Sequence, residues 1–352
     1  METYASLHAS GSGDSLPSLT QAYYDRKLLK RAERKLMHDR YGQQRPLKKN
    51  TGDQIMFRRW EKLAQNITEL TDGVTPSGKT LTHTNVVATI GQYGDFVLVT
   101  DKVNLLFVDP IISEAVTLLS MQMNESMDSV VRDIITAGTN LYRSTADDSS
   151  AAYGTGARST VNGCITKEMC DAAITALEAE DAEYPESRIN ATKNVATQPV
   201  GEAFVCIIHP HVAHDLVNDK SNMGTDFVPT EKYSSTTKLL FGEVGKYRNI
   251  RFVSTTNSKI WADEGGTTGV STDVYRSTTG TSADVYSCLL IGMNAYGTVP
   301  LPGASKTIHK GFGSAGTTDP LNQRATVGWV AWRTAAILND AWMIRMEVAA
   351  LH

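Results

Sequence analysis

The sequence predicts an α+β fold organised around one unusually long helix and a long two-stranded hairpin. Three observations lead to this prediction. A helical repeat of apolar residues runs from 109 to 138, three segments between 54 and 101 have strand composition, and the later elements do not alternate as regular βαβ units. With 352 residues, 41% of them hydrophobic, the chain can form one large or two ordinary domains.

The charge of the chain is unevenly distributed. The formal net charge is -4, yet residues 1–62 carry 13 Lys and Arg against 7 Asp and Glu, whereas the rest carries 21 against 31. A basic end on an acidic body can bind nucleic acid, an anionic membrane surface or the acidic surface of another copy. No apolar run approaches the roughly 20 residues that span a bilayer, and the first 20 residues do not resemble a signal peptide. We therefore expect a protein made in the cytoplasm with no membrane partner.

Residues 20–41 are predicted to form a basic amphipathic helix. Apolar residues recur at helical spacing and Gly42 follows as a stop signal. The basic side chains are Arg26, Lys27, Lys30, Arg31, Arg34 and Lys35. They either pack on an acidic neighbouring surface or contact nucleic acid, and the sequence contains no base-reading motif.

Three strands are predicted next, at 54–60, 81–90 and 93–101, because β-branched and aromatic residues dominate and partly alternate with polar ones. The first two flank a polar stretch, Glu61 to Thr80, that is rich in Thr, Gly and Pro. This pattern indicates a long two-stranded arm with a mobile tip.

The long helix has the strongest signal in the chain. Asp109 caps it, Pro110 begins it and Gly138 ends it. About 28 residues would span about 42 Å. The apolar stripe consists of Ile112, Val116, Leu119, Met123, Met127, Val130 and Ile134.

A compact α+β region is predicted after a polar loop at 139–163. Thr166 begins a short helix, and strands are expected at 202–209 and 249–257, with a helix between them. A flexible stretch at 257–282 precedes the final strands, which lie within 284–300, 324–338 and 341–350.

The segment GVTPSGKT, Gly73 to Thr80, matches the phosphate-binding pattern GxxxxGK[ST]. That chemistry needs a buried strand before the loop and a helix after it, so that backbone N–H groups cradle the phosphates. Here the preceding residues are polar and the following ones favour a strand. We therefore interpret the segment as the turn at the tip of the arm.

Other motifs are similarly weak. GFGSAG, Gly311 to Gly316, matches GxGxxG, but Pro320 prevents the helix that a dinucleotide site needs. His209, His211 and His214 could bind a transition metal, although a strand–turn–helix context would point them apart. Cys164, Cys170, Cys206 and Cys288 lack metal-ligand spacing and are expected to be buried free thiols. No catalytic, cofactor or metal site is predicted, and we do not expect an enzyme.

The order of these parts resembles that of the major capsid proteins of tailed phages, whose shell fold is named after phage Hong Kong 97. Local segments are similar to the N-four-like branch of these proteins. They are YYDRKLLKRAERKLMHDRYGQQRPLKKNTGDQIMFRRW, TDGVTPSGKTLT, IGQYGDFVLVTD, FGEVGKYRNIRFVSTTN and AWMIRMEVA. The resemblance covers nearly the whole chain except the first 18 residues and the loops near 143–163 and 257–283.

The resemblance implies a domain layout. The chain would comprise an N-terminal arm at 1–51, an E-loop at 52–101, a peripheral domain from 102–164 and 321–352 with a spine helix at 109–138, and an axial domain at 165–320.

The resemblance also implies a function. Copies of the chain would form pentamers and hexamers that close an icosahedral shell around double-stranded DNA, bound by non-specific charge. The shell would lie in the virion after synthesis in the host bacterial cytoplasm. Further partners would be a portal protein, a scaffolding protein and a cement or decoration protein. By position and charge, we expect Arg58, Arg59, Lys79, Glu114, Glu125 and Asp128 to form ion pairs between copies.

Some relatives join a hairpin lysine to an asparagine of a neighbour, for which Lys79 and Asn339 would be the pair here. Other hypotheses stay open at this point. The first is an encapsulin-like cage, which has the same fold and encloses enzymes. The other two are a P-loop nucleotide-binding protein and a DNA-binding protein that uses residues 20–62.

Overall fold

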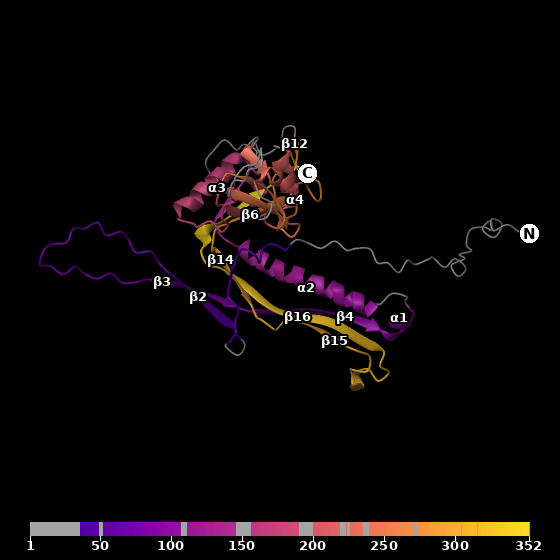
Figure 1. Cartoon of the computed structure of the whole chain (residues 1–352). Coiled ribbons are helices and arrows are strands. Elements are labelled where there is room, and N and C mark those ends of the chain that lie inside the picture. The colour runs from indigo at the N-terminus through magenta and orange to yellow at the C-terminus, as the bar shows by residue number, and fades with distance from the viewer. Residues whose placement is uncertain are drawn as a thin grey trace, which may run out of the picture.

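The computed structural model describes residues 36–48, 52–106, 111–145, 156–189, 200–218, 223, 226–234, 239–270, 273–303, 305–314 and 316–351. Figure 1 shows three parts. A long helix lies along an elongated sheet, a compact part sits at one end of that helix, and a thin arm projects away from both.

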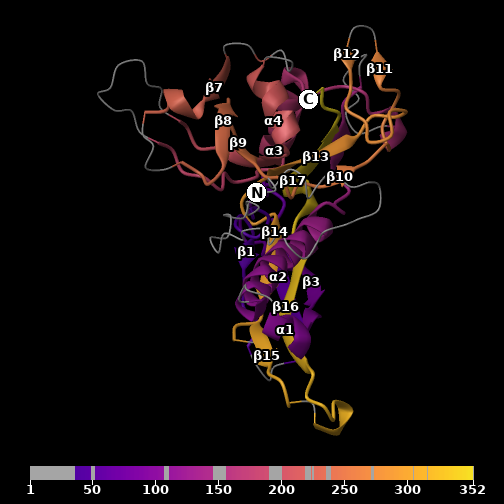
Figure 2. The same ribbon diagram turned by 90° about the vertical axis from the view of Figure 1, so that its right-hand side faces the viewer.

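A five-stranded sheet forms the elongated part. Its strands are β1 (Gln43–Gln44), β4 (Gly91–Thr100), β14 (Tyr296–Pro300), β15 (Lys306–Lys310) and β16 (Arg324–Ile337). The long β16 pairs antiparallel with β4 along one edge and with β14 and β15 along the other, and β1 runs parallel to β14. The short helix α1 (Asp101–Leu106) follows β4, and the long helix α2 (Ile111–Ile135) covers one face of the sheet (Figure 2).

Side-chain alternation along β16 explains why α2 packs there. Val327, Trp329 and Ala331 are buried and point to one face, as alternate residues of a strand do. They contact Leu119 and Met127 of α2. Burial of a side chain of this kind contributes about 1.5–3 kcal/mol. The packing therefore holds the 25 residues of α2 to the sheet.

An eight-stranded sheet forms the compact part. Seven of its strands lie side by side in the order β5 (Leu141–Arg143), β17 (Met343–Val348), β13 (Val285–Ile291), β6 (Phe204–Ile208), β9 (Ile250–Ser254), β8 (Glu243–Tyr247) and β7 (Phe227–Pro229). The eighth strand, β10 (Ile260–Trp261), pairs with β13. The helices α3 (Lys167–Ala179) and α4 (Pro210–Val217) pack on it. Smaller elements are the hairpin of β11 (Gly269–Val270) and β12 (Asp273–Val274) and the 3-10 helices η2 (Arg158–Thr160), η4 (Thr230–Lys232), η5 (Gly316–Thr318) and η6 (Asp340–Trp342).

The central strand β6 is buried on both faces. Cys206 and its alternate neighbours pack against α3 and α4, whereas Val205 and Ile207 pack on the other side with the end of α2. A strand covered on both faces has a continuous apolar run, here FVCII. The run was predicted as a buried strand, and the structure confirms it.

All four cysteines lie in the described part of the chain, where they are buried and form no disulfide with one another, as predicted. Burial raises the pKa of the Cys170, Cys206 and Cys288 thiols. These thiols behave as small core side chains.

The arm is the antiparallel hairpin of β2 (Gln54–Trp60) and β3 (His83–Thr89), which pair from Gln54–Thr89 to Trp60–His83. Residues 61–82 connect the two strands without helix or strand. The predicted two-stranded arm is therefore confirmed.

The predicted long helix is also confirmed, although Asp109 and Pro110 lie outside the described residues. Its buried stripe differs at the C-terminal end, where Val131 and Ile135 are buried in place of Val130 and Ile134. The reason is that this end packs against the compact sheet as well as against β16.

The basic helix predicted at 20–41 falls largely on residues that are not described. The described end, from residue 36, is not helical: Arg40 N–H donates to Met37 O in a turn (3.2 Å). Met37 is fully buried where α2 meets both sheets. Tertiary packing of this side chain explains why the helical pattern fails here.

Short strands were missed. The predicted loop at 139–163 contains β5, which runs parallel to β17, and the stretch at 257–282 contains β10, β11 and β12. The strands β7, β8 and β15 were not predicted either. Two to five residues are too few to show a reliable period.

Sheet membership cuts across the domain boundaries expected from the resemblance, and those boundaries stay a prediction. The strand β4, assigned to the E-loop, pairs with β16, so the arm ends at Thr89. The strands β14 and β15, assigned to the axial domain, belong to the elongated sheet, and β17, assigned to the peripheral domain, belongs to the compact sheet. Long-range strand pairing decides these memberships, and the order of segments does not reveal it.

Residues 36–48 form a strap that joins α2, the elongated sheet and the compact part. His38 N–H donates to Asp128 Oδ1 (3.0 Å), and His38 Nδ1 lies 2.8 Å from Asp128 Oδ2. Asn257 Nδ2 of the compact part donates to the same Oδ2 (2.7 Å), and Arg132 donates to Asn257 O (3.0 Å). Asp128, only 3% exposed, is therefore the centre of a polar network between three elements.

Opposing effects set the pKa of Asp128. Burial raises this pKa, but the hydrogen bonds and charge of His38 and the hydrogen bond from Asn257 outweigh burial and leave it lowered. The native fold thus keeps the carboxylate ionised.

His209 caps α4, since its Nδ1 accepts a hydrogen bond from His211 N–H (3.2 Å). Burial, the neighbouring His211 and Arg276 lower the pKa of His209 to about 4. An imidazole whose Nδ1 accepts a hydrogen bond must be neutral at that atom, which agrees with this shift.

We predict that Asp128→Ala lowers the free energy of unfolding by about 3 kcal/mol, because it leaves buried groups of His38 and Asn257 without their acceptor. Urea unfolding of the unassembled chain measures the change. The matched control is Asp133→Ala on the same helix, whose exposed ion pairs with Arg132 and Lys259 contribute under about 1 kcal/mol. Equal effects of the two substitutions would contradict the assignment of Asp128 to a buried network.

A second prediction concerns pH. Unfolded His209 takes up a proton near its ordinary pKa of about 6.5, whereas the native residue does so only near 4. The unfolded chain binds more protons in between, so the free energy of unfolding falls as pH decreases from about 6.5 to about 4, by up to about 3 kcal/mol. His209→Asn keeps a capping oxygen but does not titrate, so its stability should depend less on pH in this window. Identical pH profiles for the two chains would show that His209 does not contribute.

Candidate interaction surfaces

The arm exposes many apolar side chains. Ile67 is 91% exposed and Trp60 59% exposed, and Leu70, Val74 and Leu81 of the connecting loop are also exposed. A two-stranded hairpin is at best marginally stable alone in water, and contiguous exposed apolar surface usually marks an interaction site. The arm is thus a candidate interaction surface.

Hydrogen bonds hold the two sides of the arm together beyond the strands. Glu61 accepts from Thr84 Oγ1 (2.7 Å) and Thr82 Oγ1 (3.0 Å), and these bonds lower the pKa of Glu61. Further out, Lys79 Nζ donates to Ala64 O (2.9 Å). The loop therefore continues the direction of the hairpin (Figure 1).

The segment Gly73 to Thr80 lies within this loop. Gly73 has φ +76°, and Val74 N–H donates to Thr71 O in a turn (3.2 Å). No strand directly precedes the segment among the described residues 52–106, and the element that directly follows it is the strand β3 and not a helix. The interpretation as the arm tip is confirmed, and the phosphate-binding interpretation lacks both elements that it requires.

The other motifs have similar outcomes. GFGSAG lies in the connection between β15 and β16, followed by the 3-10 helix η5, so the predicted loop is confirmed. The expectation that the three histidines point apart is wrong for His209 and His211, whose ring centres lie 4.7 Å apart, whereas His214 lies beside Asn218. Within the described part of the chain, no group of three His, Cys, Asp or Glu side chains is arranged to hold a metal, and no helix is long and apolar enough to span a membrane.

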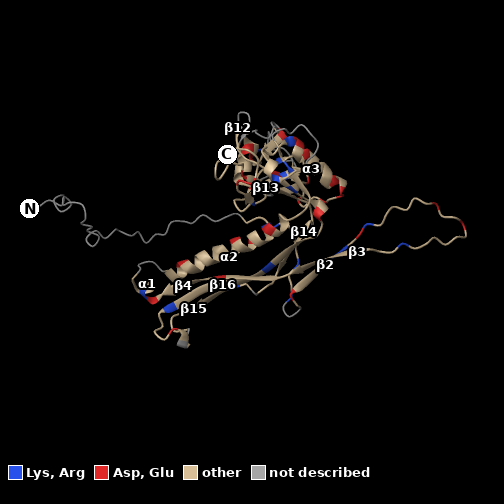
Figure 3. Cartoon of the chain, turned by 180° about the vertical axis from the view of Figure 1, so that it is seen from behind, with Lys and Arg blue, Asp and Glu red and all other residues tan. Residues whose placement is uncertain are grey.

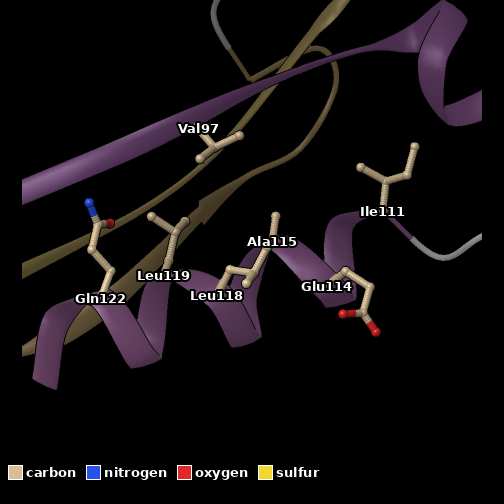
Figure 4. A pocket seen from close by; sticks show the side chains of 7 residues that line it. All are labelled: Val97, Ile111, Glu114, Ala115, Leu118, Leu119 and Gln122. Atoms are coloured by element: carbon tan, nitrogen blue, oxygen red, sulfur yellow. The ribbon is translucent and has the colours of Figure 1, made fainter. Parts of the chain in front are cut away.

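A cleft of about 500 Å³ separates α2 from β4 (Figure 4). Val97 points from β4 toward Ala115 and Leu119 of α2, while the carboxylate of Glu114 points away from them. The cleft is lined almost entirely by apolar side chains, so it fits an apolar segment.

The opposite face of β4 is apolar as well. Phe96 is 68% exposed, and Leu98, two residues on, points to the same face. This surface was missed in the sequence, although the unbroken apolar run from Phe96 to Val99 already indicated a strand with two apolar faces.

The predicted contact residues fall on different parts of the molecule. Arg58 and Arg59 are exposed at the root of the arm, and Lys79 is exposed in its loop, whereas Glu114 and Glu125 are half-buried on α2. Figure 3 shows that acidic and basic residues in general are spread over the arm, α2 and the compact part. Asp128 was wrongly predicted as an inter-subunit contact, because it is buried in the strap network. Arg26, Lys27, Lys30, Arg31, Arg34 and Lys35 lie outside the described residues.

Comparison with known proteins identifies the fold of the chain. No protein-family model and no curated protein matches the sequence. The capsid structure of cyanophage P-SCSP1u matches with a TM-score of 0.62 and 14% identity over 96% of each chain. The capsid of Ralstonia phage GP4 matches at 0.59 and 12%, over 97% of this chain and 98% of that chain. The cyanophage Pam1 capsid matches at 0.59 and 13%, over 97% and 99%.

Identities this low show the fold alone, and the N-four-like branch stays a prediction. The chain has the fold of these phage capsid structures, and its predicted resemblance to tailed-phage major capsid proteins of the Hong Kong 97 type is confirmed at the level of the fold.

Proposed function

We propose that the chain is the major capsid protein of a tailed bacteriophage, with a structural and not a catalytic role. Copies assemble into pentamers and hexamers that form the icosahedral head shell around the double-stranded DNA genome. The observation that carries this proposal is the arm, whose exposed apolar side chains need a second molecule to cover them. The fold likeness to phage capsids over 96% of the chain supports it.

Geometry favours another copy of the same chain as that second molecule. An arm that leaves one copy and lies on a different surface of the next makes a head-to-tail contact, and such contacts close into rings. The apolar cleft between α2 and β4 and the apolar face of Phe96 offer surfaces of matching character. Many weak contacts repeated in a shell add up to a stable assembly.

Charge pairs complete the proposed interface. Arg58, Arg59 and Lys79 of the arm would pair with carboxylates such as Glu114 and Glu125 of a neighbour. The basic residues between 26 and 35 would contact packaged DNA or a neighbouring acidic surface. A cross-link between Lys79 and Asn339 also remains a proposal.

Further partners follow from the proposed role. They are a portal protein, a scaffolding protein and a cement or decoration protein. The protein would be made in the host bacterial cytoplasm and reside in the capsid of the virion.

The test is to purify the chain and image it by electron microscopy together with analytical ultracentrifugation. We expect closed particles much larger than one chain. The variant Ile67→Ser/Leu70→Ser/Val74→Ser should keep its circular dichroism spectrum yet lose at least about tenfold in particle yield, because each buried side chain of this kind contributes about 1.5–3 kcal/mol.

The matched control replaces exposed loop residues that are already polar, Asn66→Ser/Thr68→Ser, and should assemble like the wild type. A wild-type chain that stays monomeric up to millimolar concentration would refute the proposed function.

A further inference from the structure

A second concave surface lies at the root of the arm. A groove of about 210 Å³ runs between the arm and the connection from β16 to β17. Its apolar floor includes Phe57, Leu338 and Trp342, and its basic rim consists of Arg45, Arg58 and Arg59. The proposed assembly does not by itself require this groove to act as a binding site.

Buried packing fixes the floor of the groove. Phe57 is buried with Leu47, Ala88, Val299 and Ala336, in a cluster that ties the hairpin to β14 and β16. Gly297 allows this close approach, because a Cβ there would lie 2.8 Å from the Phe57 ring. The groove therefore has a firm base even though the outer arm is exposed.

Among the described residues, the three guanidinium groups on the rim form no ion pair, although Glu61 lies near Arg59: hydrogen bonds from Thr84 and Thr82, and the charge of Arg59, lower the pKa of Glu61. Within the described ranges, no Asp or Glu lies at ion-pair distance from Arg45, Arg58 or Arg59. Arg58 Nε donates to Asn85 Oδ1 (3.3 Å), and the Arg45 guanidinium lies 5.8 Å from the centre of the Phe57 ring. Three like charges held beside one apolar floor repel one another, so a ligand with negative charge would be stabilised there.

The apolar floor of the groove favours one class of ligand over another. A phosphate backbone would satisfy the arginines but offer nothing apolar to Phe57, Leu338 and Trp342. A polypeptide segment with carboxylates and apolar side chains satisfies both, and guanidinium groups bind carboxylates in a bidentate manner. Other copies of the chain supply such a surface, because the chain beyond residue 62 carries 31 Asp and Glu against 21 Lys and Arg.

We propose that this groove binds a carboxylate-bearing segment of a second copy of the chain, with Arg45, Arg58 and Arg59 as its anion-binding rim. The proposal rests on the proposed assembly of copies and names the chemistry of one contact within it. Coverage of the groove removes water from the ion pairs, which strengthens them relative to exposed pairs.

The first experiment uses particles assembled from a mixture of ¹⁵N-labelled and unlabelled chains of the variant Arg58→Lys/Arg59→Lys, after nuclease treatment. Lysine keeps the charge and lets a carbodiimide form an amide with a carboxylate in direct contact. Mass spectrometry should find peptide pairs of mixed isotope that join position 58 or 59 to an Asp or Glu. Cross-links confined to one chain, or found only when DNA is present, would overturn the proposal.

The second experiment reverses the charge. Arg58→Glu/Arg59→Glu should reduce particle yield at least tenfold with an unchanged circular dichroism spectrum, whereas Lys306→Glu/Lys310→Glu on the edge strand β15 should not. Equal losses in the two variants, or no loss in the first, would also overturn it. If wild-type chains form particles but the Lys variant gives no mixed-isotope cross-links at positions 58 and 59, only the groove is refuted, whereas the absence of wild-type particles refutes the proposed function itself.

Discussion

The structure depends on one buried junction where α2 meets both sheets. Val131 and Ile135 of α2, Val205 and Ile207 of the compact sheet, and Met37 of the strap are all fully buried in a single apolar cluster. The elongated part has its own smaller core along α2, and this cluster joins α2 to the compact part and the strap, with the polar network of Asp128 beside it. Loss of the junction would leave only polar contacts between α2 and the compact sheet, because α2 has no second apolar contact with that sheet among the described clusters.

The packed cluster at the root of the arm reduces the entropy cost of the contacts that the arm makes. A hairpin that hung from a flexible base would lose conformational entropy on every contact, whereas the cluster around Phe57 already fixes the direction in which the arm leaves. Exposed apolar side chains such as Ile67 weaken the free chain's solubility. In the proposed shell, a neighbouring copy would cover these side chains, so the arm would be stabilised by the same contacts that build the shell.

Long periodic or strongly β-branched segments were predictable from the sequence, and sites that depend on tertiary contacts were not. The helix α2, the hairpin and β6 each have a local pattern that their packing agrees with. Asp128 has no such pattern: it appears as one more acid on a helix, and only the strap shows that it is buried. The groove at the arm root was invisible for the same reason, since Arg45, Phe57 and Trp342 come from three distant segments. The letters GVTPSGKT match a phosphate-binding pattern, but the motif has that meaning only between a strand and a helix, and its polar sequence context already indicated a turn.

A second polar network fixes the angle at the junction. Glu347 of β17 is fully buried and accepts from Arg143 Nε (2.9 Å) and Arg158 Nη2 (3.0 Å), while Arg345 donates to Thr136 O at the end of α2. Burial raises the pKa of Glu347, but these arginines outweigh burial and leave it lowered. Ionic groups in a low-dielectric interior need specific geometry to offset their desolvation, so the network tolerates few orientations of α2 relative to the compact sheet. In a closed shell the curvature depends on the angles that each copy holds, and a buried carboxylate with several guanidinium partners is well suited to keep such an angle.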